Sequence, residues 1–213
     1  MTSVTDAADT TSSDPTRERL LAAAAEVFGE KGYDRAGVQE IAHRAGFTTG
    51  AIYGRFRGKA DLLLAAMEAQ SADEFGELFA QSHTEGDDGE TASVLATVGT
   101  HLVTEEFDNG QALLLEAFVA ARRDPEVATM LRKAVDARAA ELTELIAKGQ
   151  ANGAIDPSLD TTALVRFCHA VGLGFLLFGA IHLPRPAAGP WEDLINTLVH
   201  AVQSPAARAP SAN

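Results

Sequence analysis

The stretch from residue 38 to residue 67, VQEIAHRAGFTTGAIYGRFRGKADLLLAAM, determines the fold of the N-terminal part of this chain. Its apolar spacing predicts two short helices, at 38–45 and 49–56, joined by a three-residue turn that begins at Gly46. Two short helices with a glycine in the turn between them are typical of a helix-turn-helix. The stretch therefore predicts a DNA-binding module.

The two helices have distinct inward and outward faces. The spacing predicts that one apolar set packs inward: Val38, Ile41, Ala42, Phe47, Ile52 and Phe56. A second set then projects outward: Thr48, Thr49, Ala51, Tyr53 and Arg55. Because Gly50 and Gly54 add no bulk, the second helix can lie close to base edges in a major groove, where Arg55 could reach a guanine or a phosphate.

The pattern around this stretch is helical almost throughout and predicts an all-α protein. Asp14 and Pro15 predict the start of a first helix that Gly32 ends, and Glu40 suggests a weak capping box on the helix at 38–45. Gly58 and Asp61 mark a fourth helix that reaches about Gln81. Further helices are expected at 91–107, 110–122, 125–151, 160–182 and 191–203. The expected organisation is a tail at 1–13, a three-helix helix-turn-helix domain at 14–62, a helical ligand-binding and dimerisation domain at 63–203, and a tail at 204–213.

Charge is distributed unevenly along the chain. The net charge of −13 argues at first against a nucleic-acid partner, but residues 16–62 carry eight basic and six acidic side chains, a net of +2. The remainder therefore carries −15. This asymmetry fits a DNA-facing module attached to a body that does not touch the duplex.

The stretch at 38–67 resembles the DNA-binding module of the tetracycline-repressor (TetR) family, with its Ile-Ala pair, turn glycine, Tyr-x-x-Phe and following lysine. The resemblance is specific over about residues 16–66 and implies a dimer that binds a palindromic operator on double-stranded DNA and responds to a small-molecule effector. It also implies roles for individual residues: Thr48 and Tyr53 contact phosphate, Thr49, Gly50 and Ala51 read bases, Arg55 contacts a base or phosphate, Lys59 clamps a phosphate, and Gln39 caps or touches the DNA backbone.

The sequence departs from that family at two places. Ala36 and Gly37 stand where a threonine or serine usually caps the second helix and contacts phosphate. Gly54 and Arg55 stand where aromatic or histidine residues are frequent. The operator sequence therefore cannot be inferred from relatives.

The C-terminal part carries weaker signals. A few side chains on apolar helices are candidates to line an effector pocket: His101, Glu105, Glu116, Phe118 and His169. Each polar residue among them could instead be an ordinary surface or core residue whose hydrogen bonds are already made and which binds no ligand. No metal site and no cofactor are expected, because His101 and His169 have no evident further ligands.

Small residues on the helix at 160–182 predict a dimer through the last two helices: Ala170, Gly172, Gly174 and Gly179. Such residues would let a partner helix approach, as in the four-helix bundle that the resemblance implies, and the alternative is packing within one chain. The apolar run at 168–181 is about 14 residues, shorter than the roughly 20 that a membrane helix needs, so no membrane partner is expected. The single cysteine, Cys168, and the absence of a secretory leader favour the cytoplasm.

Two other function classes stay open from the sequence. One is a helical ligand-binding protein or an enzyme with a vestigial DNA-binding module. No phosphate loop, nucleophile motif or metal-ligand cluster is evident, so no catalytic residue is proposed. The other is a scaffold that binds DNA without sequence preference.

Overall fold

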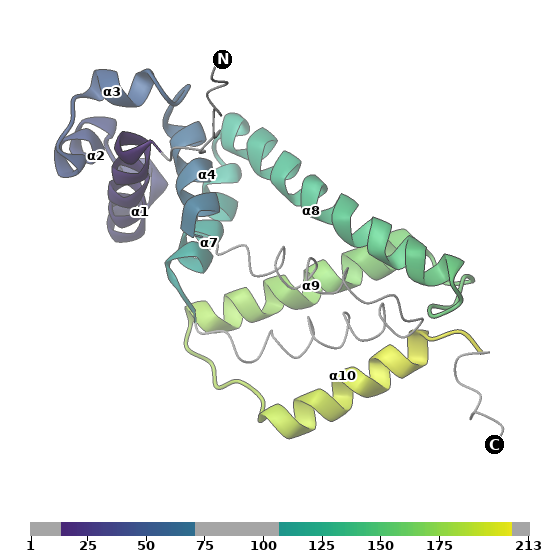
Figure 1. The fold of residues 1–213 in the computed structure, drawn as a ribbon. Coiled ribbons are helices and arrows are strands. Elements are labelled where there is room, and N and C mark those ends of the chain that lie inside the picture. Colours follow the sequence, from purple (N-terminus) through teal and green to yellow (C-terminus); the bar gives the residue numbers. More distant parts are fainter. Residues whose placement is uncertain (1–13, 71–106, 206–213) are drawn as a thin grey trace, which may run out of the picture.

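The computed structural model describes residues 14–70 and 107–205, and within these ranges it contains eight α-helices and one isolated β-bridge (Figure 1). The helices are α1 Pro15–Arg35, α2 Val38–Ala45, α3 Thr49–Tyr53, α4 Lys59–Gln70, α7 Asn109–Ala121, α8 Pro125–Ala151, α9 Thr161–Ala180 and α10 Ala188–Val202. The predicted all-α class is confirmed. Some predictions fall outside the described residues: the tail at 1–13, the fourth helix beyond Gln70, the helix at 91–107 up to residue 106, and the C-terminal tail from residue 206.

Helix α1 begins as its sequence predicts. Asp14 is the N-cap, and its Oδ1 accepts a hydrogen bond from the Thr16 amide at 3.0 Å. Gly32 interrupts the helix with φ of 73°, a left-handed conformation that only glycine adopts at little cost. The helical turn beyond it, up to Arg35, is therefore kinked relative to the main body of α1.

The ends of α2 and α3 test the predicted motif. Helix α2 has the predicted bounds, and Gly46 follows it in a left-handed conformation with φ of 77°. Helix α3 ends at Tyr53, three residues before the predicted end, and its C-cap is Gly54. The predicted capping box is wrong: the Glu40 carboxylate instead accepts hydrogen bonds from Lys31 Nζ at 2.6 and 2.7 Å.

One hydrophobic core runs from the N-terminal helices into the body of the protein. It joins buried side chains such as Phe28 of α1 and Ile52 of α3 to Leu113 of α7 and Leu131 of α8. Helix α1 packs against α4 and α7, and α4 packs against α7 and α8. The recognition module is thus anchored on the same core as the first helices of the C-terminal domain.

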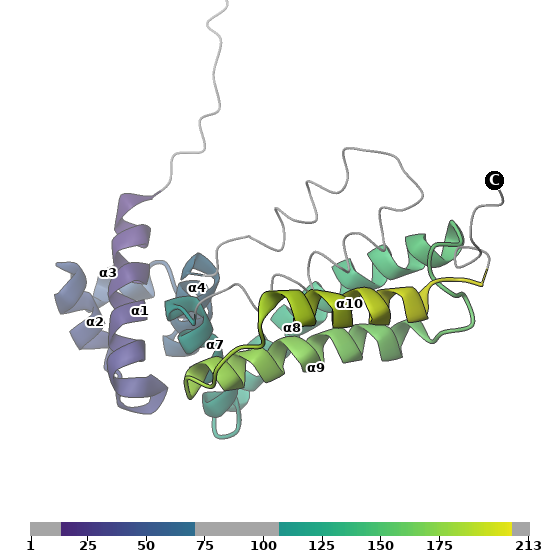
Figure 2. The ribbon, with the colours of Figure 1, turned by 90° about the horizontal axis from the view of Figure 1, so that it is seen from below.

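The last three helices extend away from that core (Figures 1 and 2). Helix α9 packs against α8, with Ile146 and Val165 in a second buried cluster. Helix α10 runs antiparallel to α9 (Figure 2) and is attached near its two ends: Trp191 packs edge-on against Phe175 with ring centres 5.0 Å apart, and Gln203 forms the isolated bridge with Ile155. It begins three residues before the predicted start, because proline is tolerated in the first turn of a helix.

Helix α9 is apolar over more residues than the predicted run at 168–181. It has 20 residues, and its best 18-residue window has a mean hydropathy of 1.7, so length and composition alone would let it cross a membrane. The predicted run begins at Cys168, beyond the charged Arg166, whereas a hydropathy average over 18 residues tolerates one such charge. Only 11% of that window is buried within the chain, so the helix presents its apolar side chains outward.

Candidate nucleic-acid interface

The turn between α2 and α3 is fixed by contacts from both sides. The Phe47 amide donates to the Ala42 carbonyl at 2.8 Å, and Arg19 Nη2 donates to the Ala45 carbonyl at 2.8 Å. The Arg19 guanidinium also lies 4.9 Å from the centre of the Phe47 ring. A Cβ at Gly46 would lie 3.0 Å from Arg19 Nη2, so this turn requires glycine for its conformation and its packing.

Helix α3 is held by its inward side chains. Ile52 is fully buried and Phe56, just beyond the helix, is 3% exposed, while Val38 and Phe47 are partly buried against the same core. The predicted inward set is confirmed by this burial. On the other side Tyr53 is 61% exposed and Thr48 and Arg55 are also exposed, with Thr49 and Ala51 partly so.

The outer surface of α3 has little bulk and an available hydroxyl. Thr48 is the N-cap residue, and its side chain makes no capping hydrogen bond. Gly50 is exposed beside it. On α2, Gln39 is exposed, whereas Ala36 is buried and the N-cap Gly37 offers no side chain. The surface can therefore approach a groove closely, but it lacks a hydroxyl at the start of α2.

Several of the basic side chains are already paired with carboxylates. Arg55 Nε donates to Asp14 Oδ2 at 2.7 Å, and Arg44 Nη1 donates to Glu30 Oε1 at 2.7 Å. Lys31 binds Glu40, as noted above. The net charge of the module thus overstates its free positive charge, because a charge count does not show which cations are neutralised locally.

Lys59, the first residue of α4, is folded back onto α1. Its Nζ lies 4.4 Å from the centre of the Tyr33 ring and donates to the Asp34 carbonyl at 3.2 Å. Burial lowers the pKa of Lys59, and the nearby carboxylates of Asp34 and Asp124 partly oppose this effect. The proposed phosphate clamp is therefore half-buried in the free chain.

Tyr33 connects the N-terminal module to the body through contacts that we call the domain joint, formed by Tyr33, Lys59, Glu116 and Asp124. The Tyr33 amide donates to Glu116 Oε1 at 2.6 Å, and the Tyr33 hydroxyl donates to Asp124 Oδ2 at 2.8 Å. A Cβ at Gly32 would lie 3.2 Å from Glu116 Oε1, so this glycine permits the close approach of α7. No local pattern predicts the contact between Tyr33 and Asp124, because 91 residues separate them.

Removing the Tyr33 hydroxyl should destabilise the joint. We expect Tyr33→Phe to lower the free energy of unfolding by about 1 kcal/mol at pH 7, since a hydrogen bond to a partly buried carboxylate is lost. The Tyr33 hydroxyl holds the pKa of Asp124 below its usual 3.8. The stability that this hydrogen bond adds is fully present above pH 3.8, the usual pKa of the carboxyl, and is lost as the pH falls through the lowered pKa. The difference in free energy of unfolding between the variant and the wild type should therefore narrow in acid.

The measurement is urea unfolding at pH 7 and below pH 4. Tyr53→Phe is the matched control, because it removes the same hydroxyl from a side chain that is 61% exposed. Equal stability losses in the two variants would contradict a structural role for the joint.

The described effector candidates are not gathered in one site. The Glu116 carboxylate accepts a hydrogen bond from the Tyr33 amide, and its role in the pocket stays a prediction. Phe118 packs partly buried against the main core. His169 on α9 has an enclosed Nδ1 without a hydrogen-bond partner, and burial, with the charges of Arg166 and Arg138, lowers its pKa. His101 and Glu105 lie outside the described residues.

An apolar hollow of about 430 Å³ lies between α9 and the start of α10. It is lined by residues other than the predicted pocket residues: Val171, Gly174, Phe175, Phe178, Leu183, Pro184, Pro186 and Trp191. Elsewhere in the described ranges, no group of three His, Cys, Asp or Glu side chains is placed to hold a metal ion.

Helices α9 and α10 and the segment between them expose many large apolar side chains. Of the ten exposed large apolar side chains in the described ranges, eight belong to this part of the chain: Phe167, Leu173, Leu177, Phe178, Ile181, Leu183, Leu194 and Leu198. We call these eight residues the apolar face. Gly172 and Gly174 have open space beside them, but a Cβ at Gly179 would lie 2.9 Å from Phe107, so Gly179 serves packing within the chain.

Comparison with known proteins is consistent with this arrangement. Residues 20–66 match the family model described as bacterial regulatory proteins, tetR family, and residues 85–202 match tetracyclin repressor-like, C-terminal domain. The transcriptional regulator UidR of Escherichia coli K12 is 27% identical over 173 residues, covering 78% of this chain and 82% of that protein.

Two further relatives differ in the extent of the match. The transcriptional activator FasR of Mycolicibacterium smegmatis is 46% identical over 55 residues, covering 26% of this chain and 25% of that protein. The structure of Salmonella enterica GusR has a TM-score of 0.71 with 22% identity, and the match covers 91% of this chain and 99% of that one. Sequence similarity is thus stronger over the short FasR segment, whereas the fold is shared over the whole length of GusR.

Proposed function

Because this chain belongs to the TetR family of bacterial regulatory proteins, and is therefore a DNA-binding transcriptional regulator with a ligand-binding C-terminal domain, we propose that it is a repressor. In this proposal its dimer binds a palindromic operator and a small-molecule effector releases it. Its DNA target places the protein in the cytoplasm. Relatives named as regulators favour this function over the alternative of an enzyme with a vestigial module.

The observation that carries the proposal is the rigid α2–turn–α3 unit with its small, polar outer surface. Ile52 and Phe56 fix the orientation of α3, and Thr48, Thr49 and Tyr53 project from the other side. We assign Thr49, Gly50 and Ala51 to base edges, Thr48, Tyr53 and Lys59 to phosphates, Arg55 to either, and Gln39 to the DNA backbone. Contacts to base edges determine the preferred sequence, whereas contacts to phosphates fix the position of the protein on the duplex, and the assignment follows this division.

The dimer in this proposal forms through the apolar face. An exposed patch of this extent on a protein surface is typical of an interface with another molecule. A two-fold pair of α9 and α10 helices would cover both copies of the face and place two α3 helices on successive major grooves, roughly 34–36 Å apart.

Effector control requires that the ligand bind one arrangement of the dimer better than the other. Helix α4 is suited to transmit the change, because it contacts α1, α7 and α8 and begins at Lys59 within the domain joint. We propose that His101, Glu105, Glu116, Phe118 and His169 contribute to the effector pocket. A shift of α7 or α8 on ligand binding would then move Tyr33 and Lys59 together.

Selection of the purified protein against random duplex DNA tests the proposed function. We expect enrichment of a palindromic consensus whose half-sites lie about one helical turn apart. Failure to enrich any sequence at low salt would contradict it, and enrichment of a single, non-repeated site would contradict the proposed dimer geometry.

Substitutions in the interface should separate affinity from sequence preference. We expect Lys59→Ala to weaken binding to the consensus and to a scrambled duplex alike, and to reduce the slope of log affinity against log salt by about 0.9 per subunit. Thr49→Val should instead change the preferred sequence. Binding titrations at several salt concentrations and a repeated selection measure these effects. An altered consensus with Lys59→Ala would contradict its assignment to phosphate.

A further inference from the structure

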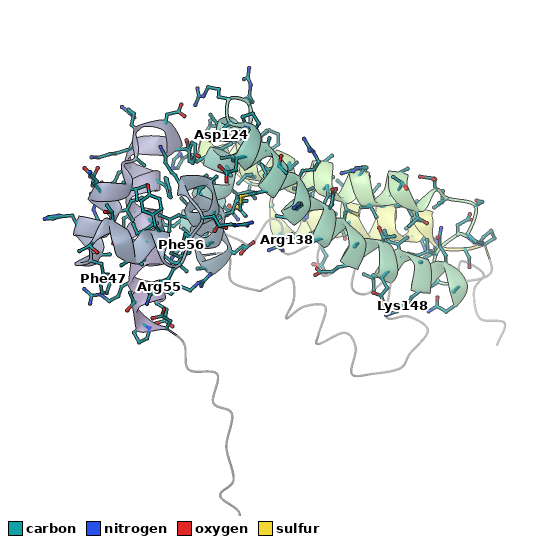
Figure 3. All side chains as sticks on the ribbon, turned by 90° about the horizontal axis from the view of Figure 1, so that it is seen from above. Phe47, Arg55, Phe56, Asp124, Arg138 and Lys148 are labelled. Atoms are coloured by element: carbon teal, nitrogen blue, oxygen red, sulfur yellow. The ribbon has the colours of Figure 1, made fainter. Side chains whose placement is uncertain are left out.

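Arg55, at the end of the recognition motif, is held by an acidic residue from the start of the chain's first helix. Its Nε donates to Asp14 Oδ2 at 2.7 Å, across 41 residues of sequence, and its Nη1 is 3.5 Å from the Ala51 carbonyl. Figure 3 shows Arg55 close to the point where α1 begins. The cation assigned to DNA is thus paired within the free protein.

The two oxygens of Asp14 have separate functions. Oδ1 accepts the Thr16 amide and caps α1, whereas Oδ2 accepts Arg55. Capping needs only an acceptor oxygen, and asparagine caps helices as well as aspartate does. Binding to Arg55 also uses the negative charge, so the two functions can be separated by substitution.

The pair is exposed enough to exchange partners. The side chains of Arg55 and Asp14 are 33% and 42% exposed, and an ion pair in such a position contributes modestly because water screens it. A DNA phosphate carries the same charge and the same type of acceptor oxygen as Asp14. Arg55 can therefore pair with the carboxylate or with DNA.

We propose that Asp14 competes with DNA for Arg55 and so limits the affinity of this regulator for its operator. When Arg55 turns to DNA, the carboxylate loses its partner and stays beside the phosphates, which repel it. Both effects lower affinity, and they act once in each subunit. The proposal rests on the proposed function, since it requires that α3 bind DNA.

The test is a double-mutant cycle on Asp14 and Arg55, with a labelled duplex carrying the selected consensus as the probe. We expect Asp14→Asn to raise the affinity of the dimer roughly three- to thirtyfold, because two modest pairs are removed. In an Arg55→Gln background the same substitution should change affinity much less. Thermal unfolding of Asp14→Asn should show only a small loss of stability, since the cap is retained and one exposed ion pair is removed.

Glu18→Gln is the matched control. It removes one negative charge one turn further along α1 from an exposed side chain. An effect of Asp14→Asn no larger than that of Glu18→Gln, or one that persists in the Arg55→Gln background, would overturn the proposal while wild-type binding still supports the proposed function. Absence of wild-type binding to any duplex would overturn both.

Discussion

Leu177→Glu should convert the dimer into monomers and weaken operator binding by at least about 100-fold, because two linked half-site contacts become independent. Leu177 lies on the apolar face and is 54% exposed within one chain, so its replacement should leave the fold of the subunit intact. In a two-fold interface the substitution would place two carboxylates against apolar surface, where they are poorly solvated. Sedimentation analysis gives the oligomeric state, and titration with the consensus duplex gives the affinity.

Val119→Glu is the matched control for this prediction. Val119 is also an exposed apolar side chain on a helix, 41% exposed on α7, but it does not belong to the apolar face. We expect this variant to remain dimeric and to bind the operator normally. A dimeric Leu177→Glu protein would refute the assignment of the interface to α9 and α10.

Ile52→Ala should abolish operator binding and lower the free energy of unfolding by about 2–5 kcal/mol, the range for truncating a buried isoleucine. Ile52 is the fully buried residue of α3, a helix of five residues that is too short to be stable by itself. Without this anchor the orientation of Thr48, Thr49 and Tyr53 is lost. Urea unfolding and duplex titration measure the two effects.

Ile52→Val tests whether the packing of this residue is responsible for the stability and operator binding lost in Ile52→Ala. It removes one methylene group and should cost only about 0.5–1.5 kcal/mol, with operator binding largely retained. Full operator affinity in a folded Ile52→Ala protein would show that α3 does not depend on this contact for its orientation.

Most of the helices could be predicted because their signals are local. Asp14-Pro15 and Asp124-Pro125 each combine a side-chain cap with a proline that fits the first turn, and the structure has helices beginning at both sites. The inward positions of Ile41 and Ile52 followed from the 3.6-residue period. The end of α3 was predicted three residues too late, since Gly54 and Arg55 gave a weaker signal than the apolar Phe56 beyond them.

The outward-facing residues of the candidate DNA surface could also be predicted. The intramolecular partners of its basic side chains could not. The outward set around Tyr53 followed from the motif and its spacing. The pairing of Arg55 with Asp14 and of Lys59 with Tyr33 depends on where the tertiary fold places the two ends of α1. A count of charges treats all these cations as equivalent.

Local sequence was enough to predict the all-α class, the helix-turn-helix and the apolar character of the last two helices, because caps, glycine turns and helical periodicity act over a few neighbouring residues. The long-range contacts came from the fold: Glu116 on the Tyr33 amide, Gly179 against Phe107, and Asp14 on Arg55. These contacts join residues from 41 to more than 80 positions apart, or depend on the angle between helices. They are set by the packing of the shared core, which no local pattern encodes.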